Sequence, residues 1–519
     1  MQIATHLKRM LNLELGLLLL LLLLALILGT YHLEYYPMTW FDEGWWLQVP
    51  RNLVQYGQYA TRSSEGFRSY DTVVGASPAF YLPIALAFKI GGIGLAQARL
   101  VMVAYFLLTC LLLYAVAREL YGWRVALVAL ALFILVKPDD GFTSALLLGR
   151  QVMAEVPALC FLMAGTLAWL RSFKGRTSLL LGLSGLFWGL AVTTKSQLLL
   201  GVLPMLAVLA ALDGLYYRQR RYQHYVIPFI GVLVVMGLQY AFILAVNGPD
   251  AFSRYLTEFA EASGPQVRVL LSPVAMQTGL KFFLRSGYVV WLLPALLSAI
   301  LGCVSRKAEN IRSCLPWVFV SGWLAWFLVA SVGWARYAFP ALAVSYMLVA
   351  RLLDDLAEWS AFSLSQIRHA IRTWDWASVV RPVSMMLLLV MLLLNSSRDV
   401  IKGIFSAPDS SPQQFAAYVQ AHVGKDDLIE TWEWGIAFLV GDHAFHHPPT
   451  SLLNALIAHE NLGTPYDASA YDFQQYAPKY IIVGPFAEWT GLYPSAFLEK
   501  CTLVVSIGQY SLFKVNGGG

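Results

Sequence analysis

The sequence predicts a polytopic α-helical membrane protein with a small α/β domain at its C-terminal end. Of its 519 residues, 58% are hydrophobic and only 13% are charged, and the mean hydropathy is +0.60. Soluble chains carry about a quarter charged residues and about half apolar ones. The apolar excess therefore needs lipid around it, which excludes a water-soluble protein with one core and a disordered protein. A net charge of +5 is too small to indicate a nucleic-acid partner.

About 20 mostly apolar residues are needed for a membrane-spanning helix, and the first such stretch is Leu11–Thr30. A basic segment precedes it, as in a signal peptide, but no small-residue cleavage site follows it. The tyrosine-rich stretch at 31–36 is typical of an interfacial aromatic belt, so we expect an uncleaved anchor. Ten further spans are predicted at 99–117, 125–137, 153–171, 178–194, 197–213, 226–246, 286–303, 314–333, 337–352 and 383–398.

The orientation of these spans depends on whether the short apolar stretch Ala79–Gly91 crosses the membrane. Cytoplasmic loops are enriched in Lys and Arg, and basic residues cluster at 118–124, 171–176, 218–221, 306–312 and 351–381. All five clusters are cytoplasmic only if Ala79–Gly91 forms an interfacial helix. We therefore expect about eleven spans in a plasma (inner) membrane, with a cytoplasmic N-terminus and an extracytoplasmic C-terminal region.

Two domains follow from this arrangement. Residues 1–397 form the transmembrane domain, in which 31–98 is the first outer loop with its interfacial helices, and residues 398–519 form an extracytoplasmic α/β domain. Strands of that domain are expected at 427–432, 480–483, 502–505 and 510–515, the last two joined as a hairpin across Gly508, with helices at 412–422 and 450–459.

The first outer loop contains two adjacent acids, Asp42 and Glu43, among several aromatic residues. Ionised carboxylates beside apolar surface are costly unless they are paired, bind a cation or serve a function. A helix N-terminus, where acids are favoured by the macrodipole, would also explain them. Neighbours on a helix point about 100° apart, so we expect only one of the two to face a substrate and choose Asp42 as the base.

Four more charged residues lie at the outer ends of predicted spans. Glu155 interrupts an apolar helix and has Arg150 nearby, which fits either a structural salt bridge or a second acid of the site. Lys195 interrupts the apolar region 178–213, where it could reach the interface by snorkelling or bind a phosphate. Arg336 occupies a short turn and could either anchor the interface with aromatic residues or bind phosphate oxygens with its planar donors.

Metal and nucleophile motifs are weak. His443, His446 and His447 lack the helical spacing of zinc proteases, and we interpret them as part of a surface loop. The five cysteines show no CxxC or metal-binding spacing, so free thiols are expected. No Ser/His/Asp arrangement has a defensible spacing.

Several segments, taken in order, resemble the GT-C membrane glycosyltransferases, in particular protein O-mannosyltransferases and bacterial aminoarabinose transferases. The likeness covers roughly residues 1–350. It departs from the family at Glu155, where many relatives carry aspartate, and before the surface helix, where Ala76-Ser77-Pro78 replaces a Pro-Pro motif. The matching segments are Asp42-Glu43, Ser77–Pro83, Gly94–Leu100, Arg150 with Glu155-Val156-Pro157-Ala158, Thr194-Lys195 and Arg336-Tyr337.

This resemblance implies a glycosyltransferase, hexosyl or pentosyl, that moves a sugar from a polyprenyl-phosphate-linked donor to a glycan, lipid or protein acceptor outside the cytoplasm. The catalytic residues would be Asp42, as the base of an inverting displacement, and Glu43, with Glu155 as the second or acceptor acid. Lys195, Arg336 and Arg150 would bind the donor phosphate. The acids permit a divalent cation without requiring one.

Two other functions fit a chain of this composition. A transporter or lipid flippase usually has repeated halves and helices broken near the midplane, and the sequence shows no matching halves. A membrane scaffold that presents the C-terminal domain would have no reason to collect four charged residues on one side.

Overall fold

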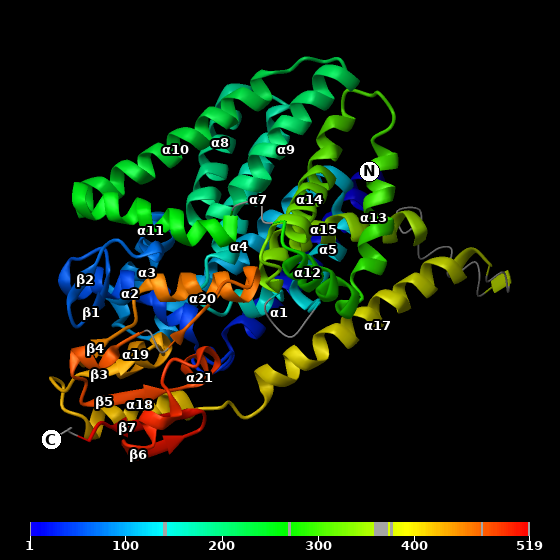
Figure 1. Cartoon of the computed structure of the whole chain (residues 1–519). Helices are drawn as coiled ribbons and strands as arrows, with labels where there is room; N and C mark the ends of the chain where they lie inside the picture. Colours follow the sequence, from blue (N-terminus) through cyan, green and yellow to red (C-terminus); the bar gives the residue numbers. More distant parts are fainter. Residues whose placement is uncertain are drawn as a thin grey trace.

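The computed structural model of the chain describes residues 2–138, 143–267, 271–357, 372–373, 377–468 and 471–516. A bundle of long helices forms most of the molecule, and a five-stranded mixed sheet with its own helices lies against one end of it (Figure 1). The predicted fold class, a polytopic helical bundle with a C-terminal α/β region, is confirmed.

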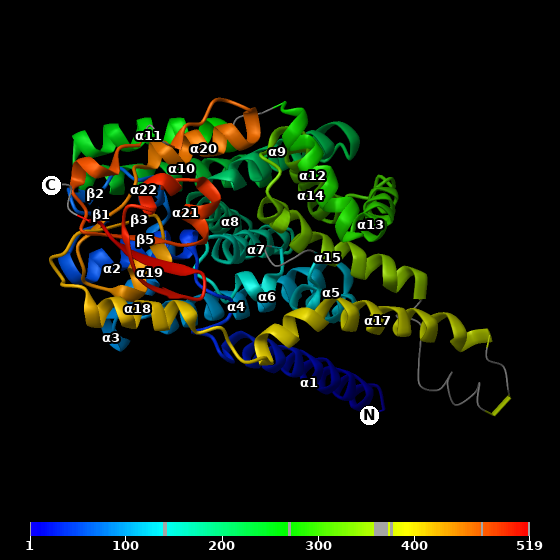
Figure 2. The ribbon, with the colours of Figure 1, turned by 60° about the horizontal axis from the view of Figure 1, so that its bottom comes forward.

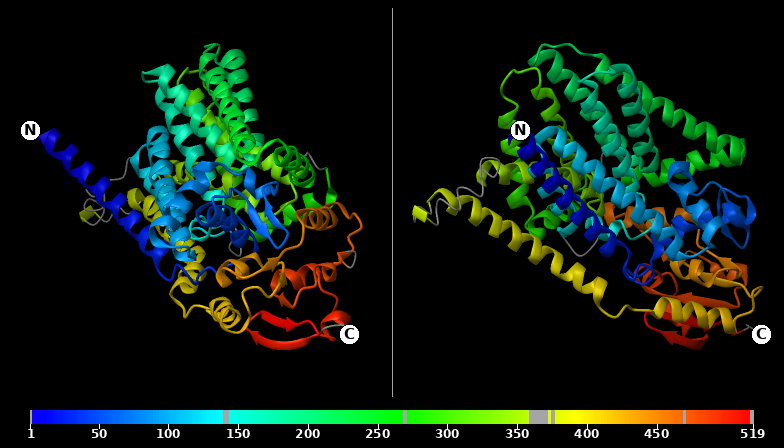
Figure 3. Two further views of the ribbon diagram at one scale, coloured as in Figure 1. Left: turned by 90° about the vertical axis from the view of Figure 1, so that its left-hand side faces the viewer. Right: turned by 180° about the vertical axis from the view of Figure 1, so that it is seen from behind.

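Eight helical segments of the described residues are long and apolar enough to cross a membrane. They are α1 (Gln2–Thr30), α4 (Leu95–Tyr121), α8 (Thr177–Thr194), the continuous segment Ser196–Tyr216 that contains α9 (Leu199–Ala211), α10 (Gln223–Asn247), α14 (Asn310–Ala330), α15 (Ala335–Ala357) and α17 (Ala377–Phe405). Helices α1 and α17 run along the edge of the bundle and expose many apolar side chains (Figure 3).

The other three predicted spans also correspond to helices. Helix α5 (Trp123–Leu135) has only 13 residues, and α7 (Glu155–Ser172) begins and ends with charged turns. Helix α13 (Val289–Gly302) follows α12 (Pro273–Ser286) after a bend of 96°, and the two together would make a ninth crossing. How many of the eleven helices cross lipid stays a prediction.

The stretch Ala79–Gly91 forms helix α3 (Pro78–Gly91), which has 14 residues. At 1.5 Å per residue it is about 21 Å long, shorter than a hydrocarbon core of about 30 Å. Both ends of α3 lie on the same side of the bundle. Before its first residue, the backbone N–H of Ser77 donates to the carbonyl of Thr193 at the end of α8. After its last residue, α4 begins within a few residues and places Arg99 against Glu43 of the first outer loop. This geometry agrees with a helix that does not cross.

The opposite end of the bundle gathers basic loops. Glu119 forms ion pairs with both Lys174 (2.6 Å) and Arg312, which joins three of the predicted basic clusters. At the same end, Arg118 contacts Glu14 of α1 at 2.5 Å. These three basic clusters and the outer-loop residues therefore lie at opposite ends of the same helices, which agrees with the predicted orientation; most of the cluster at 351–381 lies outside the described residues.

The C-terminal region contains a sheet with the strand order β4-β3-β5-β7-β6. Strands β3 (Ile429–Thr431), β5 (Tyr480–Val483), β6 (Thr502–Ile507) and β7 (Tyr510–Lys514) confirm the predicted strands, and β6 and β7 form the hairpin across Gly508. Helices α18 (Ser411–His422) and α20 (Thr450–Leu462) confirm the two predicted helices. Strand β4 (Phe445–His446) and helix α19 (Trp434–Val440) were not predicted, because two residues and seven residues are too short to show a periodicity.

This region docks on the first outer loop through helices α2 (Phe41–Tyr56) and α19. Their backbones approach so closely that a Cβ atom on Gly44 would lie 2.2 Å from the backbone nitrogen of Gly435. Arg51 of α2 forms a 3.1 Å ion pair with Asp442 at the edge of the same contact. Because α17 continues to Phe405, the linker between the bundle and the sheet region is short (Figure 1).

We expect Gly44→Ala to weaken this docking. A new methyl group against rigid backbone forces the two helices apart, at a cost of about 1–3 kcal/mol, although the same change in an open helix is stabilising. Thermal unfolding in detergent and limited proteolysis after Phe405 would measure the effect. The matched control is Gly237→Ala in α10, where a Cβ meets no atom within 4 Å; equal melting temperatures for the two variants would contradict the close packing.

Candidate functional site

A cavity of about 420 Å³ lies where the helix bundle, the first outer loop and the C-terminal region meet. Four of the predicted charged residues line it: Asp42, Glu155, Lys195 and Arg336. They come from four separate segments of the chain, and each lies at the end of a helix. Asp42 is in the first turn of α2, Glu155 begins α7, Lys195 ends α8 and Arg336 is the second residue of α15.

Asp42 and Glu43 point in different directions, as adjacent positions on a helix must. The Asp42 carboxylate lies in the cavity wall and forms an ion pair with Arg336. Both side chains keep some exposure, 14% for Asp42 and 17% for Arg336. The rings of Trp334, Tyr337 and Trp40 surround the Arg336 guanidinium at 5.0–5.9 Å.

The second pair is Lys195 with Glu155, whose Nζ and Oε1 atoms are 2.6 Å apart. This pair is more deeply buried, with 9% and 2% of the side chains exposed. Lys195 also lies 5.2 Å from the centre of the Tyr337 ring, beside Arg336. Two cations and two carboxylates therefore form one compact group, and each cation already has a carboxylate partner.

Glu43 lies outside this cavity. Its carboxylate accepts two hydrogen bonds from Arg99 of α4, at 2.6 and 2.8 Å, and a third from the backbone N–H of Val152 at 2.9 Å. Both side chains are fully buried, with 0% exposure. The structure therefore does not bring Glu43 to the predicted catalytic position, and its contacts attach α2 to α4 and to the second outer loop.

Arg150 also does not reach the cavity. Its guanidinium donates to the backbone carbonyls of Leu28, Tyr31 and Tyr36, and the residue is fully buried. These bonds attach the second outer loop to the end of α1. The expected contact of Arg150 with a donor phosphate is therefore not supported by its position.

The C-terminal region supplies a further part of the cavity wall. Helix α20 contributes Leu453, Asn454 and Ile457, and helix α21 (Pro485–Thr490) contributes Phe486 and Trp489. Sequence reasoning missed this wall, because apolar and aromatic residues of a tail carry no signal that distinguishes a cavity wall from a core.

The short helix α21 is held by a buried acid that lies between strand β3 and helix α19. Glu433 accepts hydrogen bonds from the backbone N–H groups of Phe486 (2.8 Å) and Ala487 (3.0 Å) at the start of the helix. Burial raises the pKa of the Glu433 carboxyl to about 7. Phe486 in turn stacks on Phe41 with 3.8 Å between ring centres, and Phe41 directly precedes Asp42.

The predicted surface loop at His446-His447-Pro448-Pro449 is wrong for its two histidines, which are buried, and His443 is partly buried. His446 lies 2.5 Å from Glu430 through Nδ1, and His447 lies 2.8 Å from the carbonyl of Thr431 and stacks on Trp434 at 3.6 Å. His443 contacts the carbonyl of Val423 at 3.2 Å. Within the described part of the chain, no group of three or more His, Cys, Asp or Glu side chains has an arrangement that could hold a metal ion.

Comparison with known proteins agrees with this architecture. A family model described as dolichyl-phosphate-mannose-protein mannosyltransferase matches residues 76–240, a stretch that includes Glu155 and Lys195. No curated protein matches the sequence. The crystal structure of ArnT from Cupriavidus metallidurans in the apo state is similar over 96% of this chain and 97% of that chain, with a TM-score of 0.63 and 13% identity.

The chain has the GT-C fold. ArnT bound to undecaprenyl phosphate matches over 98% of both chains, with a TM-score of 0.62 and 14% identity. The archaeal oligosaccharyltransferase AglB from Archaeoglobus fulgidus, in complex with an inhibitory peptide and a dolichol-phosphate, matches over 92% of this chain and 70% of that one, with a TM-score of 0.57 and 12% identity. The GT-C fold and the long apolar helices identify a multi-pass membrane protein.

Arg99, the ion-pair partner of Glu43, was not identified as such from the sequence. The residue begins a predicted span, and an arginine inside a membrane segment usually has a carboxylate partner or a site nearby. That signal could have paired it with one of the two acids in the first outer loop. The pairing would have left the other acid, Asp42, for the cavity.

We expect Glu43→Gln to destabilise the protein by about 3–5 kcal/mol, because it leaves the Arg99 charge buried without a carboxylate. Unfolding in detergent would measure the loss, with the exposed Glu34→Gln as the matched control. Replacing both partners, as Glu43→Leu with Arg99→Met, should restore much of the stability. If Glu43→Gln unfolded like the control but lost an activity, Glu43 would belong to the chemistry after all.

Proposed function

We propose that this protein is an integral-membrane glycosyltransferase that moves a sugar from a polyprenyl-phosphate-linked donor to an acceptor hydroxyl on the outer face of the membrane. The observation that carries the proposal is the convergence of Asp42, Glu155, Lys195 and Arg336 in one cavity. The N-terminus would lie in the cytoplasm and the C-terminal region outside, in a plasma (inner) membrane.

An anionic lipid donor is supported by the charge and orientation of the groups at the cavity. Lys195 and Arg336 supply two cations, and the positive ends of the dipoles of α2, α7 and α15 all lie at the cavity. The apolar bundle beside it offers a lipid-facing surface for a prenyl chain. Two of the similar structures contain undecaprenyl phosphate and dolichol-phosphate, which supports the same class of donor here.

Asp42 is the proposed general base. The acceptor oxygen attacks the anomeric carbon, its proton passes to the Asp42 carboxylate, and the bond from the anomeric carbon to the phosphate oxygen breaks with its electrons on the phosphate. The configuration inverts in this single displacement, with no covalent glycosyl-enzyme. A base of this kind contributes about 10²–10⁴-fold to the rate.

The ion pair between Arg336 and Asp42 gives the donor a way to activate the base. The donor phosphodiester competes with Asp42 for the guanidinium, and the guanidinium is well suited to phosphate oxygens. When Arg336 turns to the phosphate, the Asp42 carboxylate becomes free to accept a proton. As the leaving phosphate gains a second negative charge, Arg336 and Lys195 stabilise it.

Glu155 has two proposed roles. It holds Lys195 at 2.6 Å, and, as a carboxylate that lines the same cavity as Asp42, it would orient an acceptor hydroxyl. Should the reaction use a divalent cation, these two carboxylates are the candidate oxygen ligands.

We expect Asp42→Asn to reduce transfer by at least 100-fold while the protein still folds and binds the donor. The amide keeps the size of the side chain but cannot accept the proton. Transfer from a panel of radiolabelled polyprenyl-phosphate sugars into membrane extract would measure this, with the exposed Asp426→Asn as the matched control. Normal turnover by the Asp42→Asn variant would exclude Asp42 as the base. If the folded wild type gave no product from any donor, the result would favour a transporter or flippase.

We expect the loss of either cation to weaken donor binding by about 10-fold or more, since charge-assisted hydrogen bonds are worth about 1.5–3 kcal/mol. Suitable variants are Arg336→Gln, and Lys195→Met combined with Glu155→Gln so that no unpaired carboxylate stays buried. Binding of undecaprenyl phosphate in detergent micelles, measured by native mass spectrometry, tests both. The exposed Lys402→Gln is the control, and wild-type affinity in both variants would overturn the phosphate role.

A further inference from the structure

We propose that the acceptor is an uncharged carbohydrate, and that the wall formed by α20 and α21 receives its sugar ring opposite Asp42. This inference rests on the proposed transferase function and goes beyond it by naming the class of acceptor. It depends on three features of the cavity: how rigidly this wall is held, which charges are already paired, and which chemical groups the wall presents.

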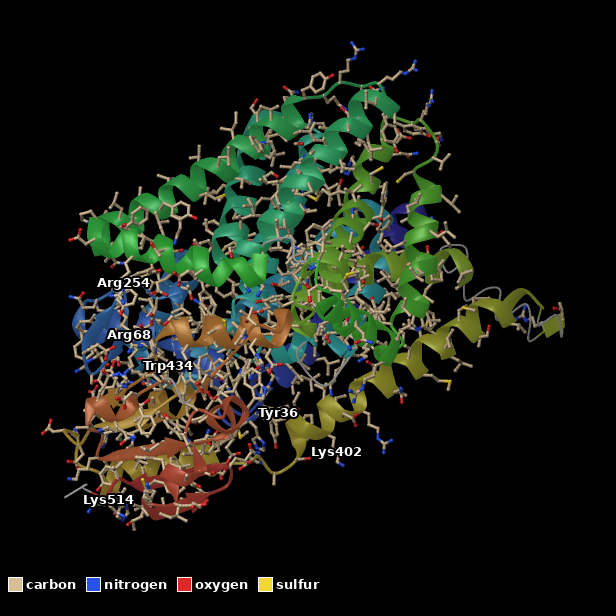
Figure 4. All side chains as sticks on the ribbon, in the orientation of Figure 1. Tyr36, Arg68, Arg254, Lys402, Trp434 and Lys514 are labelled. Atoms are coloured by element: carbon tan, nitrogen blue, oxygen red, sulfur yellow. The ribbon has the colours of Figure 1, made fainter. Side chains whose placement is uncertain are left out.

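Helix α20 is fixed to the first outer loop at its first residues. The Arg68 guanidinium donates to the carbonyls of His447 (2.6 Å) and Pro448 (3.1 Å), directly before the helix. The Thr450 hydroxyl, at the first residue of the helix, donates to Asp71 at 3.0 Å. Figure 4 labels Arg68 at this junction, and Figure 2 shows α20 running beside α11 (Pro249–Val267).

Helix α21 is fixed to the catalytic helix itself. Glu433 binds its first backbone N–H groups, and Phe486 stacks on Phe41 with an angle of 17° between the rings. Because Phe41 precedes Asp42, the stacked pair sets the distance between α21 and the proposed base. The wall and the carboxylate therefore form one rigid unit, as a site that must orient an acceptor hydroxyl requires.

The charges of the cavity leave no cation for an anionic acceptor. Among its described lining residues, the two cations are Lys195 and Arg336, and each is paired with a carboxylate. The donor phosphate adds a further negative charge and competes for the same two cations. A phosphate or carboxylate on the acceptor would then be desolvated without a partner, and burying an unpaired charge is strongly unfavourable.

The wall instead presents groups that suit a neutral sugar. Phe486 and Trp489 offer aromatic faces, and Trp489 is 56% exposed at the mouth of the cavity. The C–H face of a pyranose is apolar and can pack on such rings, while its hydroxyl groups point outward. Asn454 of α20 lines the same cavity, and its Nδ2 atom is buried without a hydrogen-bond partner, so it can donate to a sugar hydroxyl.

A binding experiment tests this inference without any need for turnover. Saturation-transfer NMR on the full-length protein in micelles, with the two cations occupied by saturating undecaprenyl phosphate, would compare neutral methyl glycosides of glucose, mannose and galactose with the corresponding sugar phosphates and a Ser/Thr peptide. We expect a signal from at least one methyl glycoside, and affinities at least 10-fold lower for the phosphates. Stronger binding of the sugar phosphates or of the peptide, or no binding of any glycoside, would overturn the proposal.

Variants of the wall connect that binding to the acceptor position. Trp489→Ala and the near-isosteric Asn454→Leu should each weaken glycoside binding by about 10-fold, and should raise the KM for a glycan acceptor without changing the affinity for undecaprenyl phosphate. Phe67→Ala, which removes an exposed ring of strand β2 (Gly66–Arg68) away from the cavity, is the control. Unchanged glycoside binding in both wall variants would contradict the assignment.

The failure of this inference can be told apart from the failure of the proposed function. If no donor gives product but glycoside binding depends on Trp489, the transferase assignment fails and the carbohydrate site stands. If transfer depends on Asp42 but goes to a phosphorylated lipid or a peptide, the transferase assignment stands and the carbohydrate acceptor is wrong.

Discussion

The buried ion pair between Glu43 and Arg99 is the constraint on which the arrangement of the site depends. It attaches the first turn of α2 to the membrane helix α4, and it reaches the second outer loop through the N–H of Val152. Such a pair contributes little net stability relative to apolar residues, but either partner alone is very costly. Its effect is therefore to allow one orientation of α2. In that orientation Asp42 enters the cavity and Phe41 stacks on Phe486, so the proposed base and the proposed acceptor wall are both positioned by a neighbouring acid that lies outside the cavity.

The two ion pairs in the cavity differ in a way that fits different roles. Lys195 and Glu155 are almost completely buried, and a pair of this kind is costly to open because each charge would be left without a partner. Arg336 and Asp42 keep more exposure, and the guanidinium lies among aromatic rings that can stabilise it in more than one position. The first pair is suited to a fixed cation behind the phosphate, and the second to an exchange in which an incoming anion replaces the carboxylate. The charged residues thus provide both a rigid and an adjustable part of the proposed donor site.

Sequence alone predicted the helical bundle, four strands of the sheet and four residues that line the cavity. These predictions succeeded because long apolar stretches and isolated charges in apolar surroundings have few physical explanations. That α3 does not cross the membrane stays a prediction. Glu43 and Arg150 were assigned to the site because a charge beside lipid indicates a need for a partner without saying which partner. For Glu43 the partner is Arg99, and for Arg150 it is a set of backbone carbonyls. The aromatic wall of the C-terminal region was not predictable, since Phe486 and Trp489 face the cavity only because Glu433 and Phe41 hold α21 there.

A common fold with 13% sequence identity leaves room for different acceptors, and the proposed acceptor wall is the part of this chain where such a difference would arise. The charged groups that would serve a lipid phosphate come from the membrane helices and the first outer loop, whose contacts with one another are buried and specific. The opposite wall comes from two short segments of the C-terminal region, which are joined to the site by Arg68, Asp71 and one stacked ring pair. Substitutions on the cavity face of α20 and α21 would change what is recognised without disturbing the donor cations. Under the two proposals, the chemistry and the choice of acceptor would be carried by different parts of the chain, and the first outer loop, which contacts both, would fix their relative positions.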